Sequence, residues 1–395
     1  MPDCGGGPIE QGHDMAEVGT GAEESAAQRS RSYHILDILR GIAAMSVVVL
    51  HFPQAFAPIA APGAYLAVDL FFAMSGFVLA NAYDAKLAGE MNAGAFLRAR
   101  VIRLLPFYLV ALLLSTIELA YFYRHDGLGM AVALSTVLNF FMVPVPPVGF
   151  PDNPLFPGNF VAWTLAFELL ANIIYAVSVS RLSSQKLAIG VGASGAAVAA
   201  IAIVRGNLNG GAYWPDVHLA VLRVLFSFFL GVLVFRARAT GRLPAISIPA
   251  IVPIGIATLA LAWPVPASVR GAADAVVVLA IFPLVLIAAT ARAPRFSRRI
   301  DRLLGDVSYP IYVLQIPVFS ALVLGAARLS PHLLQASAPW IGVAVLAALC
   351  AGSWLLAQRW EVPLRRRLSI WAGRAFGSEP DRQPSQRTGQ RPTGP

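Results

Sequence analysis

The stretch DILRGIAAMSVVVLHF, from Asp37 to Phe52, is apolar enough to enter a membrane, yet it carries an arginine near one end and a histidine near the other. Ten uncharged residues separate Arg40 from His51. A helix turns about 100° and rises 1.5 Å per residue, so the two side chains lie within roughly 20° of each other around the axis and roughly 16 Å apart along it. The spacing predicts one helix with a cation near one membrane surface and a titratable base deeper on the same face.

The composition indicates a protein embedded in lipid. Of the 395 residues, 57% are hydrophobic and only 13% are charged, and the mean hydropathy is +0.66. A soluble protein of this size needs more polar residues to cover its surface. In a membrane protein the net charge of +9 reflects loop charges that set orientation, so we expect the lipid bilayer and not nucleic acid as a partner. Cys4 and Cys350 do not suggest a disulfide framework.

Ten apolar segments approach or exceed the roughly 20 residues that a helix needs to cross a membrane. We therefore predict an all-α bundle of about ten transmembrane spans. The expected spans are 35–56, 64–83, 104–123, 159–180, 187–204, 217–237, 247–265, 272–291, 309–328 and 338–358. A further apolar stretch at 130–145 is short and runs into a proline-rich loop, so we expect it to be interfacial or re-entrant.

Loop charges orient the predicted bundle. With ten spans, the connections on one side carry most of the lysines and arginines, whereas each loop on the other side has at most one arginine. Basic loops stay in the cytoplasm, so both termini are predicted to be cytoplasmic in a multi-pass protein of the cell (inner or plasma) membrane. The ends, 1–32 and 369–395, are rich in small and polar residues and are predicted to be disordered tails around a membrane domain at 33–368.

Several motifs, in order along the chain, resemble those of the acyltransferase-3 family of polytopic membrane enzymes. The spacing of Arg40 and His51 is a hallmark of its first helix, and YLAVDLFFAMSGFVLA (Tyr65 to Ala80) is similar to its second. FLRARVIRLLPFYL resembles its basic Arg-x-x-Arg segment, WTLAFEL its Trp-x-Leu-x-x-Glu motif, LLGDVSYPIYVLQIPV its late helix start and WEVPLRRRL its C-terminal end. The resemblance, over about 33–368, implies a core of ten spans that moves an acyl group from cytoplasmic acyl-CoA to a hydroxyl of a saccharide or glycan.

An acyl-CoA co-substrate, with acetyl-CoA expected, needs an anion site at the cytoplasmic mouth. Arg98, Arg100 and Arg103 lie on the loop where such a donor would approach. Arg100 and Arg103 are three residues apart, so they can share a helix face and clamp phosphates through charge-assisted hydrogen bonds. Ordinary positive-inside charge is the alternative for these residues, and an interfacial anchor is the alternative for Arg40.

His51 is the expected general base, and it would remove the proton of the attacking hydroxyl. The alternative for His51 is a histidine that is hydrogen-bonded between helices. Burial favours the neutral imidazole, which can accept that proton. Asp69, at a similar depth on the second span, is expected either to orient the imidazole or to be a helix-end carboxylate. Glu168, near the middle of the fourth span, is expected to be a neutral hydrogen-bond donor or a proton relay. No metal is expected.

Four further positions carry weaker expectations. Ser75 and Gly76 would let a thin acyl-pantetheine arm or a neighbouring helix approach closely, and packing is the common role of such residues. Gln315 stands where many relatives have a histidine, so it can hydrogen-bond but not titrate. Arg223, inside the sixth span, has Glu168 as a candidate ion-pair partner.

Two other functions remain open at this point. A proton-coupled transporter also places ionisable residues inside its spans, and a non-catalytic membrane partner of a glycan assembly complex would keep the motifs for packing. The sequence has no visible inverted repeat and no glycine-rich phosphate loop for ATP. Direct attack and a covalent acyl-enzyme are both compatible with the residues, and acceptor identity, acyl chain length and oligomeric state stay open.

Overall fold

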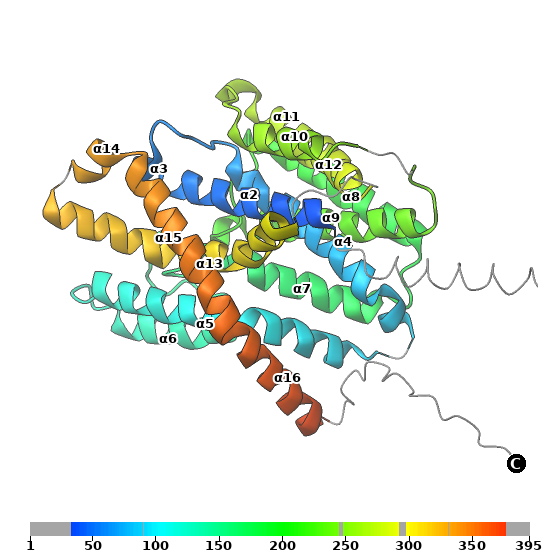
Figure 1. Cartoon of the computed structure of the whole chain (residues 1–395), viewed down its shortest axis with the longest axis horizontal. Helices are drawn as coiled ribbons and strands as arrows, with labels where there is room; N and C mark the ends of the chain where they lie inside the picture. Colours follow the sequence, from blue (N-terminus) through cyan, green and yellow to red (C-terminus); the bar gives the residue numbers. More distant parts are fainter. Residues whose placement is uncertain (1–32, 90, 245–247, 292–297, 331, 377–395) are drawn as a thin grey trace, which may run out of the picture.

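The computed structural model describes residues 33–89, 91–244, 248–291, 298–330 and 332–376. Within these residues the regular structure is helical, apart from one isolated antiparallel bridge between Pro154 and Tyr213. Figure 1 shows an elongated bundle whose long helices run mostly along one direction, crossed obliquely by the C-terminal helices. The predicted all-α membrane bundle is confirmed.

Nine helices of the described residues are long and apolar enough to cross a membrane. They are α2 (His34–His51), α4 (Ala67–Ala88), α5 (Ala93–Phe122), α7 (Trp163–Ser178), α8 (Ser184–Arg205), α9 (Val217–Ala239), the pair α11 (Arg270–Val276) and α12 (Phe282–Ala289), α13 (Arg298–Leu329), and the pair α15 (Trp340–Leu356) and α16 (Val362–Phe376). A π-helical turn joins the members of each pair, at Val277–Ile281 and at Ala357–Glu361. Four shorter helices are α3 (Pro53–Phe56), α6 (Gly129–Phe140), α10 (Ile251–Ala262) and α14 (Leu333–Ser337).

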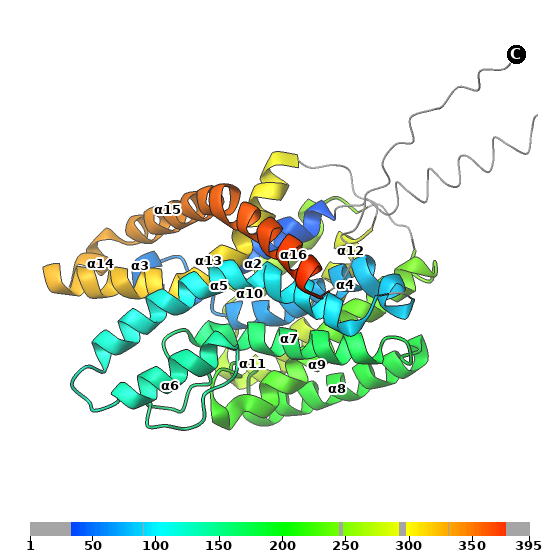
Figure 2. The same ribbon diagram turned by 90° about the horizontal axis from the view of Figure 1, so that it is seen from below.

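The described part of the chain therefore has nine long spans where the sequence predicted ten. The difference lies at 247–265, where α10 has only 12 residues. A helix of that length is about 18 Å long, which is short of the roughly 30 Å of hydrocarbon. Pro264 and Pro266 follow closely and cannot continue it. The stretch at 130–145 forms the similarly short α6, which packs beside α5 in Figure 2 and does not span, as predicted.

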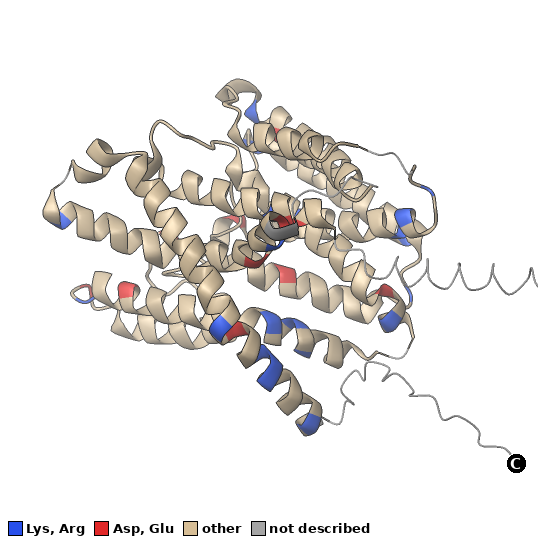
Figure 3. Cartoon of the chain, in the orientation of Figure 1, with Lys and Arg blue, Asp and Glu red and all other residues tan. Residues whose placement is uncertain are grey.

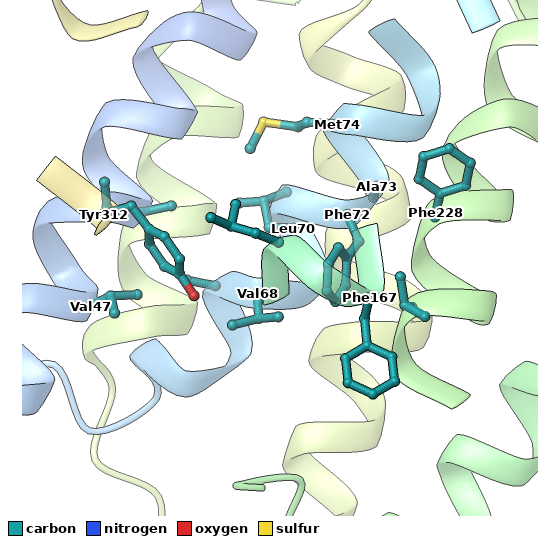
Figure 4. Packing of buried hydrophobic residues seen from close by; sticks show 14 of the residues in the cluster. Val47, Val68, Leu70, Phe72, Ala73, Met74, Phe167, Phe228 and Tyr312 are labelled. Atoms are coloured by element: carbon teal, nitrogen blue, oxygen red, sulfur yellow. The ribbon is translucent and has the colours of Figure 1, made fainter. Parts of the chain in front are cut away.

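The tightest helix contact joins α4 to α9, and glycines make it possible. A Cβ atom added at Gly76 would lie 1.9 Å from the carbonyl oxygen of Phe228, and one added at Gly231 would lie 2.0 Å from that of Ala73. Small residues let helix backbones approach closely where lipid gives no hydrophobic drive for association. Figure 4 shows Ala73 and Phe228 near this contact, together with the apolar side chains of α4 that fill the adjoining core.

The helix α2 lies inside the bundle, packed mainly on α13 and also on α4 and α10. Gly41 allows the contact with α13, because a Cβ atom there would lie 2.8 Å from Cβ of Leu304. Consequently the face of α2 that carries Arg40 and His51 is turned toward other helices and away from lipid.

Basic side chains concentrate at one end of the bundle, which we call the basic end (Figure 3). It comprises the last turn of α4, the first third of α5, the last turn of α9 and α16, with Lys86, Arg98, Arg100, Arg103, Arg236, Arg238, Arg365, Arg366 and Arg367. The helix α16 runs to Phe376, past the predicted domain boundary at 368. The predicted tail at 1–32, and the one beyond residue 376, lie outside the described residues.

Candidate active site

The basic end holds a cavity of about 210 Å³, which we call the basic cavity. Its charged lining consists of Arg40, Arg100, Arg103 and Arg365 with Glu168, Asp306 and Glu361. Arg100 Nη2 lies 3.0 Å from Glu168 Oε1, and Arg365 Nη1 lies 2.8 Å from Glu361 Oε1. Within the described residues Arg40 and Arg103 form neither an ion pair nor a hydrogen bond, so two guanidinium groups in this cavity are available to an anion.

Three of the predicted donor-binding arginines therefore share one cavity, and the fourth does not. Arg40 comes from α2, and Arg100 and Arg103 come from one face of α5. Arg98 lies on the same helix, half-buried, but it does not line this cavity. The sequence did not single out Arg365, although the run of three arginines after the last span was visible.

A smaller cavity of about 60 Å³, the middle cavity, adjoins the basic cavity. The two cavities share four lining residues, Arg40, Glu168, Ser308 and Tyr309. Ser75 also lines the middle cavity, and its hydroxyl donates to Glu168 Oε1 at 2.6 Å. The same carboxylate oxygen accepts from Arg100. Glu168 therefore has a cationic partner, Arg100, whereas the expectation of a neutral carboxyl group assumed that no cation was nearby. Its role as a proton relay stays a prediction.

A third cavity of about 400 Å³, the histidine cavity, lies beyond the middle cavity. The middle and histidine cavities share Val68 and Tyr312 as walls. The lining of the histidine cavity combines aromatic and polar side chains: His51, Tyr65, Asn209, Phe160, Trp163, Tyr213, Arg223 and Tyr312. Three neighbouring cavities, which share wall residues, thus lie between the arginines of the basic end and His51.

The side chain of Tyr213 enters this lining from the loop before α9. Burial raises the pKa of Tyr213, and the nearby carboxylates of Asp152 and Asp216 raise it further. The phenol is therefore protonated at neutral pH and can donate a hydrogen bond to a bound molecule.

Asp69 does not orient His51, in contrast to the expectation from sequence. Its carboxylate is 1% exposed and accepts from Arg223 Nη2 at 2.6 Å, from Arg223 Nε at 3.1 Å and from Ser227 Oγ at 3.1 Å. The guanidinium also donates to the carbonyl oxygens of Gly210 and Tyr65. A fully paired carboxylate has little capacity left for an imidazole, so Asp69 holds Arg223 in the cavity wall. This pairing also replaces the expected ion pair between Arg223 and Glu168.

The partner of His51 is Gln315 on α13. His51 Nδ1 lies 3.2 Å from Gln315 Oε1, and the imidazole meets the ring of Phe160 edge-on at 5.0 Å. Gln315 is fully buried. The sequence had shown only that this position can hydrogen-bond without titrating.

Ser75 and Gly76 are adjacent but separate in role. Ser75 lines the middle cavity, whereas Gly76 faces α9, lines none of the three cavities and makes the close contact with Phe228. Gly76 is thus a packing residue and not part of a donor site. Ser75 donates a hydrogen bond to Glu168 Oε1, and the same oxygen is paired with Arg100. A carboxylate held by a guanidinium is a weak base, so we assign Ser75 to the cavity wall and not to a nucleophile.

Comparison with known proteins agrees with this geometry. Residues 33–358 match the family described as an acyltransferase domain. The chain is also similar to "Protein 2 in picA locus" of Rhizobium radiobacter, at 40% identity over 157 residues, 36% of this chain and 80% of that protein. No solved structure matches. The family match extends from the start of α2 into the π-helical turn after α15 and so contains His51 and nearly the whole lining of the three cavities. The chain belongs to the acyltransferase-3 family and is a multi-pass membrane enzyme that transfers acyl groups.

Proposed function

We propose that this enzyme transfers an acyl group, and specifically acetyl, from cytoplasmic acyl-CoA to a hydroxyl of a saccharide or glycan acceptor, with His51 as general base. The observation that carries the proposal is the succession of three neighbouring cavities. They extend from the guanidinium groups of Arg40 and Arg103, which have no partner among the residues that the structure describes, to the imidazole of His51. A donor with an anionic head and a thin thioester arm matches this arrangement, because the arginine-lined basic cavity is followed by the narrow middle cavity.

The donor would bind with its phosphates in the basic cavity. Arg40 and Arg103 would hold them, and Arg100 would add a cation while it holds Glu168. The acyl-pantetheine arm would extend through the middle cavity past Ser75, where the small volume of about 60 Å³ admits only a slender chain. A short acyl group fits this passage best, which supports acetyl-CoA.

The acceptor would occupy the histidine cavity. Flat aromatic faces such as those of Trp163 and Tyr213 suit the apolar faces of sugar rings, and Asn209 with the tyrosine hydroxyls can bind sugar hydroxyls. The cavity of about 400 Å³ is large enough for a sugar unit to place one hydroxyl near His51.

In the transfer step the imidazole of His51 accepts the proton of the acceptor hydroxyl as its oxygen attacks the thioester carbonyl carbon. The new carbon–oxygen bond forms, and the carbon–sulfur bond then breaks. The electron pair of that bond leaves with the CoA sulfur, and the proton passes from the imidazolium to the thiolate. The products are an ester, free CoA and neutral His51, so direct attack requires no covalent enzyme intermediate.

The orientation in the membrane follows from charge. Basic loops are retained on the cytoplasmic side, so the basic end faces the cytoplasm and its supply of acyl-CoA. The short α10 still carries the chain from the basic end, where α9 finishes, to the opposite end, where Gly271 of α11 packs against Ala202 near the end of α8. Both termini are then cytoplasmic, and the histidine cavity opens toward the outer side. The protein resides in the cell membrane, with glycans of the envelope as the acceptor class.

The proposal is tested with full-length protein in lipid nanodiscs and radiolabelled acetyl-CoA. Thioester consumption and label transfer to a mixed panel of oligosaccharides should fall at least a hundredfold in His51→Ala, since general bases contribute about 10²–10⁴-fold. His125→Ala changes an exposed histidine in the loop after α5 and should behave as wild type. Unchanged turnover in His51→Ala would exclude His51 as the base. Label transfer to no oligosaccharide but to another hydroxyl compound would overturn the acceptor class alone.

A further inference from the structure

We propose that Gln315 is a positioning residue that holds His51 in the tautomer protonated at Nδ1, which leaves Nε2 as a free acceptor toward the cavity. The proposal rests on the proposed role of His51 as base, and it assigns that role to one nitrogen atom. Its basis is a chain of two hydrogen bonds whose direction is fixed at its far end.

That far end is the backbone of α13. Gln315 Nε2 donates to the carbonyl oxygen of Tyr312, one turn earlier, at 2.9 Å. A carbonyl oxygen only accepts hydrogen bonds, so the nitrogen of the amide must face Tyr312 and the oxygen must face the other way. The side chain is 0% exposed, so no water competes for either position.

The amide oxygen in turn dictates where the imidazole proton sits. Gln315 Oε1 lies 3.2 Å from His51 Nδ1. Oε1 has no proton to give, so the contact is a hydrogen bond only if Nδ1 carries the proton. A neutral imidazole has one such proton, and its Nε2 is then unprotonated. Nε2 has no hydrogen-bond partner among the described residues, and His51 lines the histidine cavity.

Among the described residues, Gln315 is the group that hydrogen-bonds to the His51 ring and so determines its tautomer. The edge-on contact with Phe160 restricts the ring without forming a hydrogen bond to it. The other charged or titratable side chains on the cavity are Tyr65, Tyr213, Tyr312 and Arg223. The charge of Arg223 is matched by Asp69, so within the described residues no free carboxylate faces the imidazole. A neutral amide therefore sets the tautomer of His51, whereas in many catalytic histidines a carboxylate accepts the hydrogen bond from the ring.

The first experiment compares variants of Gln315 in the acetyl-CoA turnover assay. Gln315→Leu keeps the size but removes the acceptor, and kcat should fall about tenfold, the upper range for a neutral hydrogen bond, with the donor KM unchanged. Gln315→Glu keeps an oxygen that accepts from Nδ1 but loses the donor to the Tyr312 carbonyl, so it should restore part of the lost kcat. Its charge would stabilise the imidazolium, so the acid limb of the pH–rate profile should move to higher pH. Gln185→Leu changes an exposed glutamine on α8 and should leave both parameters unchanged.

A second measurement does not depend on turnover. In protein labelled with ¹⁵N-histidine, chemical shifts distinguish protonated from unprotonated ring nitrogens, and the His51 signals are identified by their absence in His51→Ala. We expect a protonated Nδ1 and an unprotonated Nε2 above the pH at which the ring becomes neutral. The opposite pattern in the wild-type protein would overturn the proposal, even where Gln315→Leu does not fold. Loss of turnover in His51→Ala with a wild-type pH profile and kcat in Gln315→Leu would overturn it while leaving the proposed function intact.

Discussion

Two buried side-chain pairs, Asp69–Arg223 and His51–Gln315, join helices that lie far apart in the sequence. Arg40 and His51 could be related in advance because both lie on one helix, whose geometry is local. The pair Asp69–Arg223 joins residues 154 positions apart, and His51–Gln315 joins residues 264 apart. Such pairs depend on which helices become neighbours and how each is rotated about its axis, and hydropathy determines neither.

The buried pair of Asp69 and Arg223 should dominate local stability. Both side chains are 1% exposed. Asp69→Asn leaves a buried guanidinium without its counter-charge, so we expect a loss of about 3–5 kcal/mol, measured as a lower Tm in detergent. Arg205→Ala breaks the half-exposed ion pair with Asp216 and should cost less than about 1 kcal/mol. A wild-type Tm for Asp69→Asn would show that the pair is dispensable.

The arginines of α5 should differ in their effect on the donor. Arg103 lines the basic cavity without a partner among the described residues, whereas Arg98 lies outside it. Arg103→Ala should raise the KM for acetyl-CoA about tenfold, the value of one charge-assisted hydrogen bond, with kcat little changed. Arg98→Ala should change KM less than twofold, a value set by screening of distant charges. Equal effects of the two substitutions would mean that only the net charge of the loop matters.

At the scale of elements, hydropathy located the spans well but not their irregularities. A window of apolar residues identifies nine long spans because each must match the bilayer thickness. It failed at 247–265, where prolines limit α10 to 12 residues. The π-helical turn at Ala357–Glu361 was also missed, although Ala357 and Glu361 line the basic cavity. Such turns leave no mark in apolar periodicity and often occur at functional sites.

The contact of α4 with α9 should be sensitive to a single methyl group. In Gly76→Ala the added Cβ would meet the Phe228 carbonyl at 1.9 Å, and the two helices would have to separate. We expect a destabilisation of about 1–3 kcal/mol, as for overpacked cores, read out as a lower Tm and a lower yield of monodisperse protein. Gly192→Ala on α8 has open space around it and should match wild type. Equal behaviour of both variants would refute the role of Gly76 in packing.

At the scale of the whole molecule, the loop charges predicted that most basic side chains lie on one side of the membrane. In the structure these side chains of the described residues concentrate at the basic end. The sequence could not show that three cavities adjoin one another along the bundle. Their walls come from helices far apart in the chain, among them α2, α4, α5, α7, α9, α13 and α16, and from the loop before α9. That arrangement appears only when the helices are assembled.

Orientation in the membrane can be measured directly. In a background with Cys4→Ser and Cys350→Ser, single cysteines would be placed at exposed positions at opposite ends, as Arg242→Cys and Arg124→Cys. A membrane-impermeant maleimide added to intact cells should label Arg124→Cys only, because basic loops are retained inside. Both should react after permeabilisation. Labelling of Arg242→Cys alone in intact cells would invert the proposed topology.

The narrowness of the middle cavity bears on a problem that any catalyst spanning a membrane must solve. A reaction between substrates from opposite sides of a membrane needs a passage through the protein. A passage wide enough for a substrate is usually also wide enough for hydronium ions and salt ions to cross. The middle cavity measures about 60 Å³ and is lined by Glu168 and Ser75, which are hydrogen-bonded to each other, so the described residues leave only a narrow space between the two larger cavities. In the proposed orientation, an enzyme built this way would acylate molecules on the far side without discharging the electrochemical gradient across the membrane.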